Sequence, residues 1–365
     1  MTVLRSQFRP CATVLFATLL LPSCEFSPRG PAAEHANDGR GKSPATSASA
    51  VDPYQAMALT AGQDLIGTRV SDLSFRTIDG RTIRLGDRRA RRPVYLKFWA
   101  TWCVTCRAQM EAFKANYVRY AKGMDVVAVD TGVNDDLATV REYLRTHPLP
   151  MSVAIDDGRL GEAFHLKVTP QHVVIGREGV VRYVGHLEDE RLQRELRAAI
   201  DARSDDVRVG GSAPVAPPLW AARPNLDFTS VQGRRVRIGG PEVGPPRLLY
   251  FLSPWCETYL RDTRPAVAAK CRDTRKALTR AAARGVDVIG IASALSADAD
   301  GARRYIGRTG FAPPIVLDED GRLFRRFGVR SFPVVIRLDG SGRPSGRLSV
   351  AAIDALSSTF GAGGR

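Results

Sequence analysis

The order of apolar and polar residues along the chain follows the same plan twice. From residue 70 to residue 202, short apolar runs alternate with segments whose apolar residues recur every three or four positions. A diverged version of this alternation returns between residues 247 and 336. Alternating strands and helices indicate an α/β fold, with a mixed central sheet flanked by helices. The pattern therefore predicts two tandem domains, at residues 63–203 and 219–360.

The first half allows a more detailed prediction. Residues 70–75 and 82–85 are expected to form a hairpin around Asp79 and Gly80. Helices are expected after Cys103, at 135–146 and at 188–202. The remaining strands are predicted at 94–99, 124–129, 152–155, 171–175 and 180–184, and those of the second half at 247–252, 286–291, 315–317 and 331–336.

Composition marks the segments outside the two domains. Residues 24–62 are mostly Ala, Ser, Pro and Gly without apolar periodicity, which predicts a flexible tether. Residues 204–218 have a similar Gly-, Ser- and Pro-rich composition and are predicted to be a linker.

The first 23 residues have the features of an export signal. Arg5 and Arg9 precede an apolar stretch at 12–21 that is too short to span a bilayer. Leu21-Pro22-Ser23-Cys24 resembles a bacterial lipobox, in which Cys24 receives lipid and becomes the mature N-terminus. This implies a lipid anchor in the inner or outer membrane of a bacterial envelope, with the protein facing the periplasm. The alternative is an ordinary cleaved signal in which Cys24 is coincidental.

The net charge of +15 restricts the partners only slightly. The basic residues are scattered, and the one compact run, at 88–92, precedes a predicted strand. Because no nucleic-acid motif accompanies the charge, we expect no nucleic-acid partner. An anionic lipid surface suits this charge better.

Cys103 and Cys106 are the candidate reactive residues. They follow the apolar run at 94–99 and open a helix-like segment, where unpaired N–H groups and the helix dipole stabilise a thiolate. The thiolate is the species that attacks a disulfide, so this position favours thiol–disulfide exchange. The alternatives are half of a zinc site, for which the chain has no second Cys-x-x-Cys or His-x-x-x-His pair, and a structural disulfide.

Two motifs together resemble TlpA/ResA-like thioredoxins, which are extracytoplasmic and membrane-tethered. These are the segment from Phe98 to Cys106, FWATWCVTC, and Val168-Thr169-Pro170, which fits the family's cis-proline loop. The resemblance covers about residues 64–200 and implies a thioredoxin-like fold. It also implies reduction of disulfides in apocytochrome c or copper-site proteins, with an upstream electron donor.

The resemblance assigns roles residue by residue. Cys103 would be the exposed attacking cysteine and Cys106 the buried resolving cysteine, with Trp102 forming part of the surface beside Cys103. Thr169 and Pro170 would face the sulfur, where the Thr169 backbone pairs with a substrate strand. No cofactor is implied beyond the disulfide itself.

Three positions depart from the family pattern. Gln109 replaces a common glutamate and cannot accept a proton, and Glu111 replaces a common proline. Thr105 stands between the cysteines where proline is usual, which leaves the redox potential and the direction of exchange open.

In the second half, Ser253-Pro254-Trp255-Cys256 corresponds to the first cysteine motif, but Tyr259 occupies the position of the resolving cysteine. Cys271 would lie about 22 Å from Cys256 along an unbroken helix, whereas a disulfide needs Cα atoms within about 7 Å. We therefore expect Cys271 to be a core residue and this domain to be a degenerate thioredoxin-like domain for docking or stabilisation. A mixed disulfide through Cys256 is the alternative.

Two further side chains allow two interpretations each. Lys97 is either a cation beneath the cysteines, which would favour the thiolate, or a lysine that reaches the surface. His172 either approaches the cysteines or is a satisfied strand residue. Cys103, Cys106 and His172 together would also suit Cu(I), so a copper-binding lipoprotein is a rival to the exchange enzyme. A non-catalytic envelope scaffold is the other rival.

Overall fold

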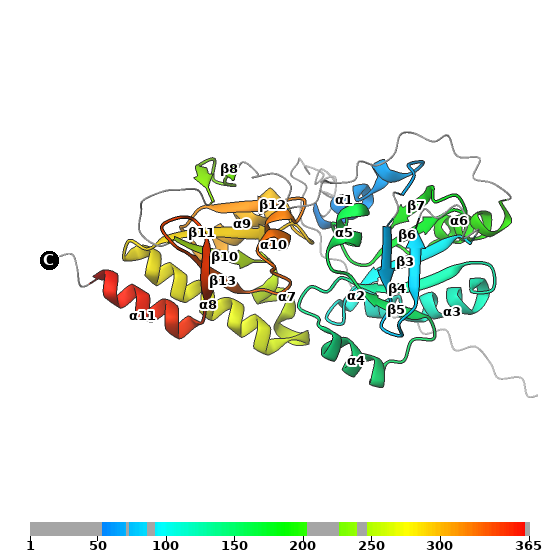
Figure 1. Ribbon diagram of the computed structural model, residues 1–365, viewed down its shortest axis with the longest axis horizontal. Helices are drawn as coiled ribbons and strands as arrows, with labels where there is room; N and C mark the ends of the chain where they lie inside the picture. The colour runs from blue at the N-terminus through cyan, green and yellow to red at the C-terminus, as the bar shows by residue number, and fades with distance from the viewer. Residues whose placement is uncertain (1–52, 71–72, 86–91, 203–225, 239–246, 362–365) are drawn as a thin grey trace, which may run out of the picture. The chain divides into compact units, whose positions relative to one another are not determined.

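The computed structural model describes residues 53–70, 73–85, 92–202, 226–238 and 247–361. These residues fall within one compact unit, Val51–Arg365. The unit holds two sheet-and-helix bodies, which we call the first body (residues 53–202) and the second body (residues 226–361) (Figure 1). The expected signal peptide (1–23), the lipid site Cys24 and the linker (204–218) lie outside the described residues.

The first body is built on a five-stranded mixed sheet with the order β5-β4-β3-β6-β7. Strand β3 is central and buried along its whole length, because it pairs with β4 in parallel and with β6 in the antiparallel direction. This sheet confirms the predicted α/β class. Its strands are β3 (Val94–Trp99), β4 (Asp125–Asp130), β5 (Ser152–Ile155), β6 (Gln171–Ile175) and β7 (Val181–Gly185).

Side chains of β3 alternate between the two faces of this sheet. Tyr95 and Trp99 point to the face covered by α3 (Met110–Tyr120), α4 (Leu137–Thr146) and α6 (Glu190–Asp201). Leu96 and Phe98 point to the opposite face, which packs against α5 (Arg159–Ala163) and the hairpin of β1 (Leu73–Arg76) and β2 (Thr82–Leu85). The cysteine motif therefore begins where a fully covered strand ends.

The expected tether ends earlier than residue 62. Helix α1 (Pro53–Thr60) and a 3-10 turn (Gln63–Leu65) belong to the first body, and Ala58 and Leu65 are buried. The Ala- and Gly-rich composition suggested a mobile segment, but small residues also allow a short helix to pack closely. The prediction of a flexible tether is thus wrong from residue 53 onward.

The second body has the same strand order, β12-β11-β10-β13-β14. Its central strand, β10, pairs with β11 in parallel and with β13 in the antiparallel direction, as β3 does with β4 and β6. The strands are β10 (Arg247–Leu252), β11 (Asp287–Ser293), β12 (Ile315–Asp318), β13 (Val334–Leu338) and β14 (Pro344–Leu348).

The layers of the second body also match those of the first. Helices α8 (Pro265–Ala283), α9 (Ala299–Thr309) and α11 (Val350–Gly361) cover one face of the sheet. The other face packs against α10 (Arg322–Arg326) and the hairpin of β8 (Asp227–Thr229) and β9 (Arg235–Arg237). The two bodies are thus the same arrangement built from different core residues.

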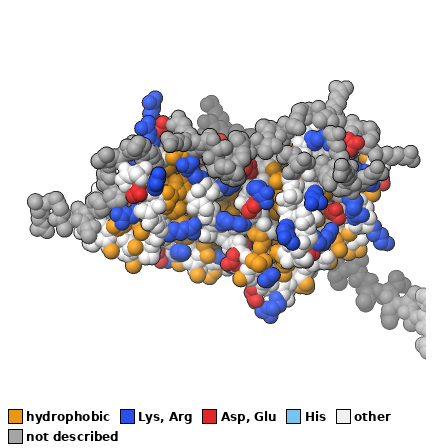
Figure 2. Space-filling view, in the orientation of Figure 1, with side chains coloured by type: hydrophobic (Ala, Val, Ile, Leu, Met, Phe, Trp, Pro, Cys, Tyr) orange, Lys and Arg blue, Asp and Glu red, His pale blue; other side chains and the backbone are white. Residues whose placement is uncertain are grey.

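The visible surface has Lys and Arg side chains spread among acidic ones, without one dominant basic patch (Figure 2). This agrees with the scattered basic residues of the sequence. Among the described residues, none of the helices combines the length and apolar content that a membrane crossing needs.

Candidate active site

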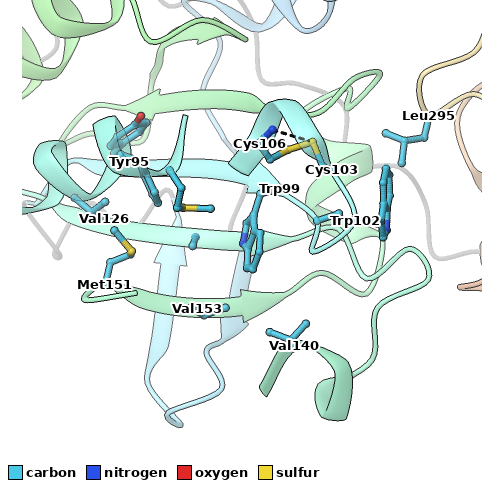
Figure 3. Packing of buried hydrophobic residues seen from close by; sticks show 14 of the residues in the cluster. Tyr95, Trp99, Trp102, Cys103, Cys106, Val126, Val140, Met151, Val153 and Leu295 are labelled. Carbon is cyan, nitrogen blue, oxygen red and sulfur yellow. Dashed lines mark hydrogen bonds between the residues drawn. A yellow bond between two sulfur atoms is a disulfide. The ribbon is translucent and has the colours of Figure 1, made fainter. Parts of the chain in front are cut away.

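A disulfide joins Cys103 and Cys106 directly after the central strand of the first body, with their Cα atoms 5.2 Å apart (Figure 3). Cys103 is the N-cap of α2 (Val104–Ala108), and its sulfur accepts a hydrogen bond of 3.1 Å from the Cys106 backbone N–H. A hydrogen bond to sulfur favours the charged thiolate over the thiol. The reduced pair is therefore held ready for nucleophilic attack.

The proline loop faces this pair, as predicted. The Thr169–Pro170 peptide bond is cis, and the Thr169 carbonyl oxygen lies 3.8 Å from the Cys103 sulfur. The same oxygen accepts a hydrogen bond of 3.4 Å from the Thr105 hydroxyl. The structure thus brings together Cys103, Cys106, Thr169 and Pro170.

The expected exposure of Cys103 and Trp102 is wrong. Cys103 is only 1% exposed and Trp102 only 2%, and both belong to one buried cluster with Leu295 and Phe332 of the second body (Figure 3). The sequence motif describes a surface sulfur, but it contains no information about residues far along the chain that cover it. The Cys103 sulfur, expected to attack, is buried beneath residues of the second body.

Two contacts define this cover directly at the cysteine turn. The Trp102 and Trp255 ring centroids are 4.9 Å apart, and the Tyr259 hydroxyl accepts a hydrogen bond of 3.0 Å from the Val104 backbone N–H. Tyr259 lies on α7 (Cys256–Thr263) of the second body. A polypeptide that reaches Cys103 must displace these contacts.

An ion pair between the partly exposed Arg264 and the buried Asp135 holds the edge of this cover. Arg264 of the second body donates to the Asp135 carboxylate at 2.9 Å and also to the Thr101 hydroxyl. The Asp135 side chain is fully buried, which raises its pKa, while hydrogen bonds from Thr101 and the charge of Arg264 oppose this rise. Neither Asp135 nor Arg264 stands out in the sequence, because neither belongs to a cysteine or proline motif.

Lys97 is fully buried, so it does not reach the surface. Its ammonium group donates to the Glu188 carboxylate at 3.3 Å, and to the backbone and side-chain oxygens of Gln109 at 3.2 and 3.3 Å. Burial lowers the pKa of Lys97 to about 8, although the charge of Glu188 opposes this shift. Burial also raises the pKa of Glu188 against the attraction of Lys97. A charged pair therefore lies behind the helix that carries Cys106.

His172 is a satisfied strand residue. Its Nδ1 lies 2.8 Å from the Tyr95 hydroxyl and its Nε2 lies 3.0 Å from the Gln109 side-chain oxygen. An amide oxygen only accepts, so Nε2 carries the proton and Nδ1 accepts from Tyr95. Burial lowers the pKa of His172 far below its usual value, which keeps the ring neutral. In the part of the chain that the structure describes, no three His, Cys, Asp or Glu side chains are grouped to hold a metal ion.

The second pair of cysteines corrects another expectation. Cys256 and Cys271 form a disulfide with Cα atoms 6.3 Å apart, so Cys271 is not simply a core residue. The estimate of about 22 Å assumed one straight helix. Arg264 has non-helical dihedral angles, and a new helix, α8, starts at Pro265. The chain therefore turns between the two cysteines, and Pro265 at a helix start was the sequence signal for this turn.

Comparisons with known proteins agree with the geometry of the first body. The model of the AhpC/TSA family matches residues 66–184. The thioredoxin-like protein YneN of Bacillus subtilis is 29% identical over 133 residues, which are 36% of this chain and 78% of that protein. The thiol-disulfide oxidoreductase ResA of Bacillus anthracis is 26% identical over 148 residues, covering 40% and 84%. The thiol:disulfide interchange protein DsbE of Yersinia pestis is 30% identical over 138 residues, covering 36% and 71%.

Proposed function

This chain belongs to the thiol–disulfide oxidoreductases of the AhpC/TSA family, and on that premise we propose that Cys103 and Cys106 reduce disulfides of partner proteins in a bacterial envelope. The observation that carries the proposal is the Cys103 sulfur, which accepts the Cys106 N–H and faces the Thr169 carbonyl. The disulfide itself is the redox group, and no other cofactor takes part.

The exchange has two steps. The Cys103 thiolate attacks one sulfur of a partner disulfide, the partner's other sulfur leaves as a thiolate, and a mixed disulfide forms. The Cys106 thiolate then attacks Cys103, which releases the partner as a dithiol and leaves Cys103–Cys106 oxidised. A separate protein dithiol returns two electrons to this pair. The backbone of Thr169 and the ring of Trp102 would contact the partner polypeptide once the second body moves aside.

The second body serves in this proposal as a degenerate thioredoxin-like domain, over residues 219–360. The identical strand order of the two sheets supports this assignment. It lacks a Cys-x-x-Cys pair, because Tyr259 stands at the position of the second cysteine, and its Trp255 and Tyr259 cover the first site. Access to Cys103 is then controlled by the contact between the two bodies.

The finer assignments concern location and substrate. An N-terminal signal (1–23) and lipid on Cys24 would anchor the chain to a membrane with both bodies in the periplasm. Apocytochrome c and copper-site proteins are the proposed substrates, because their cysteines must be reduced before a group is attached. Replacement of Cys24 by serine should release the exported protein from the membrane fraction.

Trapping tests the exchange. In a Cys106→Ser variant of the exported protein, the mixed disulfide on Cys103 is not resolved, and we expect partner proteins to remain covalently attached. The matched control is a Cys103→Ser/Cys106→Ser variant, which should capture none of them. Absence of captured partners, together with unchanged cellular function of the Cys106→Ser variant, would contradict the proposal.

A further inference from the structure

We propose that Cys256–Cys271 is a second redox-active disulfide, which exchanges electrons with Cys103–Cys106 inside the same chain. The inference rests on the proposed function of the first pair and extends it. It gives the sealed site a role, because the neighbours of Cys103, Trp102 and Val104, contact Trp255 and Tyr259 of the chain's own second cysteine turn.

The backbone around Cys256 matches that around Cys103, although the Cys256 sulfur lies 3.9 Å from the Val267 carbonyl and the Cys103 sulfur faces the Thr169 carbonyl. Each follows a tryptophan at the start of the helix after the central strand, and each backbone N–H donates at 3.1 Å to a carbonyl oxygen three residues earlier. The indole N–H of Trp102 donates at 2.7 Å to the Val133 carbonyl, and that of Trp255 donates at 2.7 Å to the Leu295 carbonyl. Cys256 therefore occupies the place of an attacking cysteine, although its partner comes from α8.

The two cysteine turns meet through reciprocal contacts. The N–H of Asn134 in the first body donates to the Arg330 carbonyl at 3.0 Å, and the N–H of Ser296 in the second body donates to the Lys167 carbonyl at 2.6 Å. Asn134 and Ser296 both have left-handed backbones, with φ of 56° and 57°. The two acceptors, Lys167 and Arg330, each precede the loop proline of their own body by three residues.

Such a pairing, in which equivalent groups contact each other in both directions, is the mark of a two-fold related interface. The Trp102 and Trp255 rings, each next to the first cysteine of its own pair, are in contact across it. All four cysteines consequently belong to one buried cluster. The interface brings the two cysteine turns face to face rather than burying unrelated surfaces.

Burial favours exchange between these pairs over exchange with small thiols. Cys103 and Cys256 are each 1% exposed, Cys271 is 2% exposed and Cys106 is fully buried. A thiolate in such a place has access to very few disulfides in solution. The disulfide on the other side of the same interface does not need to diffuse to the site, so its effective concentration is high.

The exchange balances without any further reactant. With the first pair reduced to a dithiol by a protein dithiol, Cys103 loses its proton and the resulting thiolate attacks Cys256. The Cys256–Cys271 bond breaks, and Cys271 leaves as a thiolate and takes a proton. Cys106 loses its proton and attacks Cys103, and Cys256 leaves in turn and is protonated. Two electrons and two protons have then passed from the first pair to the second. The same steps run in reverse, so the difference in reduction potential sets the direction.

Partial reduction followed by mapping tests this exchange in the full chain. The oxidised protein receives one equivalent of dithiothreitol, is quenched with acid at intervals, and is alkylated and digested for mass spectrometry. We expect alkylated thiols to appear first at Cys103 and Cys106 and later at Cys256 and Cys271. The rate of this transfer to the second pair should not depend on protein concentration. In a Cys103→Ser/Cys106→Ser variant, which keeps the second disulfide, dithiothreitol should reduce Cys256–Cys271 at least about tenfold more slowly than in the wild type.

Three results would overturn the inference. Reduction of insulin disulfides by the wild-type protein serves as the assay of the proposed function. If the second pair stays oxidised while the wild-type protein still reduces insulin, the exchange inside the chain is refuted and the proposed function stands. Equal reduction of Cys256–Cys271 in the Cys103→Ser/Cys106→Ser variant would mean direct reduction by dithiothreitol. Failure of the wild-type protein to reduce insulin would refute the proposed function as well.

A trapped intermediate provides an independent readout. In a Cys106→Ser/Cys271→Ser variant, mild oxidation with diamide should link Cys103 to Cys256 within single chains, as seen by peptide mapping of the monomer. The matched control is Cys106→Ser/Cys256→Ser, which keeps Cys103 and Cys271 and should yield at least about tenfold less of a Cys103–Cys271 link. Equal yields from the two variants would contradict a specific attack on Cys256.

Discussion

The two bodies place different residues behind their cysteine turns. Lys97 and Tyr250 each stand two residues before the end of a central strand, and both are buried. In the first body Lys97 pairs with Glu188, and both contact groups near the cysteine helix. In the second body Tyr250 packs edge-on against Phe311, and burial raises its pKa, with smaller contributions from Tyr305 and the charges of Glu257 and Arg275.

The difference shows that the charged pair is not required by the fold. Burying two charges costs desolvation energy that their attraction does not always recover, and apolar groups often fill the same space at no loss of stability. The second body has an uncharged tyrosine at the matching strand position, and its own ion pair, Glu257–Arg275 at 2.7 Å, joins α7 to α8 instead. The buried Lys97–Glu188 pair behind the first cysteines is therefore a feature of the first body that the shared sheet does not require.

The largest expected effect comes from breaking this pair. Glu188→Gln leaves the Lys97 charge buried without a counter-charge, which should lower the free energy of unfolding by about 3–5 kcal/mol. The corresponding change in the second body, Tyr250→Phe, removes one hydroxyl and should cost less than about 1.5 kcal/mol. Urea denaturation of both variants at neutral pH measures the difference. Equal losses would mean that the two positions are energetically equivalent.

The titration of Lys97 gives this comparison a pH dependence. Its pKa is about 8 in the folded protein, against 10.5 for an unperturbed lysine. Between these values the unfolded chain holds a proton that the folded protein has lost, so the Lys97 contribution to the free energy of unfolding rises with pH. The Lys97→Met variant should lack this contribution. Urea unfolding midpoints of the wild type and of Lys97→Met, measured at about pH 7 and about pH 10, test this. Parallel pH profiles would refute it.

The sequence was sufficient for the features that depend on local patterns. The apolar runs located the central strands. The Cys103–Cys106 motif identified the reactive pair, and the family resemblance of Val168-Thr169-Pro170 identified the loop that faces it. Glu188 escaped notice because it follows the last strand of the body, where a single acidic residue resembles a solvated charge. Its role depends on the packing of α6 against the sheet, which no short motif encodes.

A second effect concerns the cover over Cys103. Arg264→Met removes the counter-charge of the buried Asp135 and two hydrogen bonds across the interface. We expect the contact between the bodies to weaken by about 2 kcal/mol, so that iodoacetamide alkylates reduced Cys103 about 30-fold faster. Arg261→Met, at an exposed position of α7 one turn before Arg264, is the control and should leave the rate unchanged. An unchanged rate in Arg264→Met would mean that this ion pair does not hold the cover.

Contacts between distant segments explain why this cover could not be predicted. Tyr259 was noticed only as a missing cysteine, yet its hydroxyl binds the residue that follows Cys103. Cys271 was misplaced because helix periodicity continued through Arg264, while the chain turns there. Periodicity reports which face of a helix is buried, but it does not report where the helix changes direction.

A further prediction separates the roles of Lys97 and Glu188. A buried cation favours a nearby thiolate and a buried anion opposes it. The midpoint of Cys103 alkylation against pH should therefore move upward in Lys97→Met and downward in Glu188→Gln, each by about one pH unit. The double variant should lie between them. Shifts in the same direction would indicate a general loss of packing instead of an electrostatic effect.

The smallest effect tests one hydrogen bond of the cover. Tyr259→Phe removes the acceptor of the Val104 N–H but keeps the ring that packs against Trp102. Loss of one such bond costs about 1 kcal/mol, so Cys103 alkylation should become about fivefold faster. Tyr120→Phe is the matched control, because its hydroxyl donates at 3.0 Å to Gln193 within the first body. If both variants accelerate alkylation equally, the faster reaction reflects lower stability of the first body, and the Tyr259 hydroxyl has no specific part in closing the site.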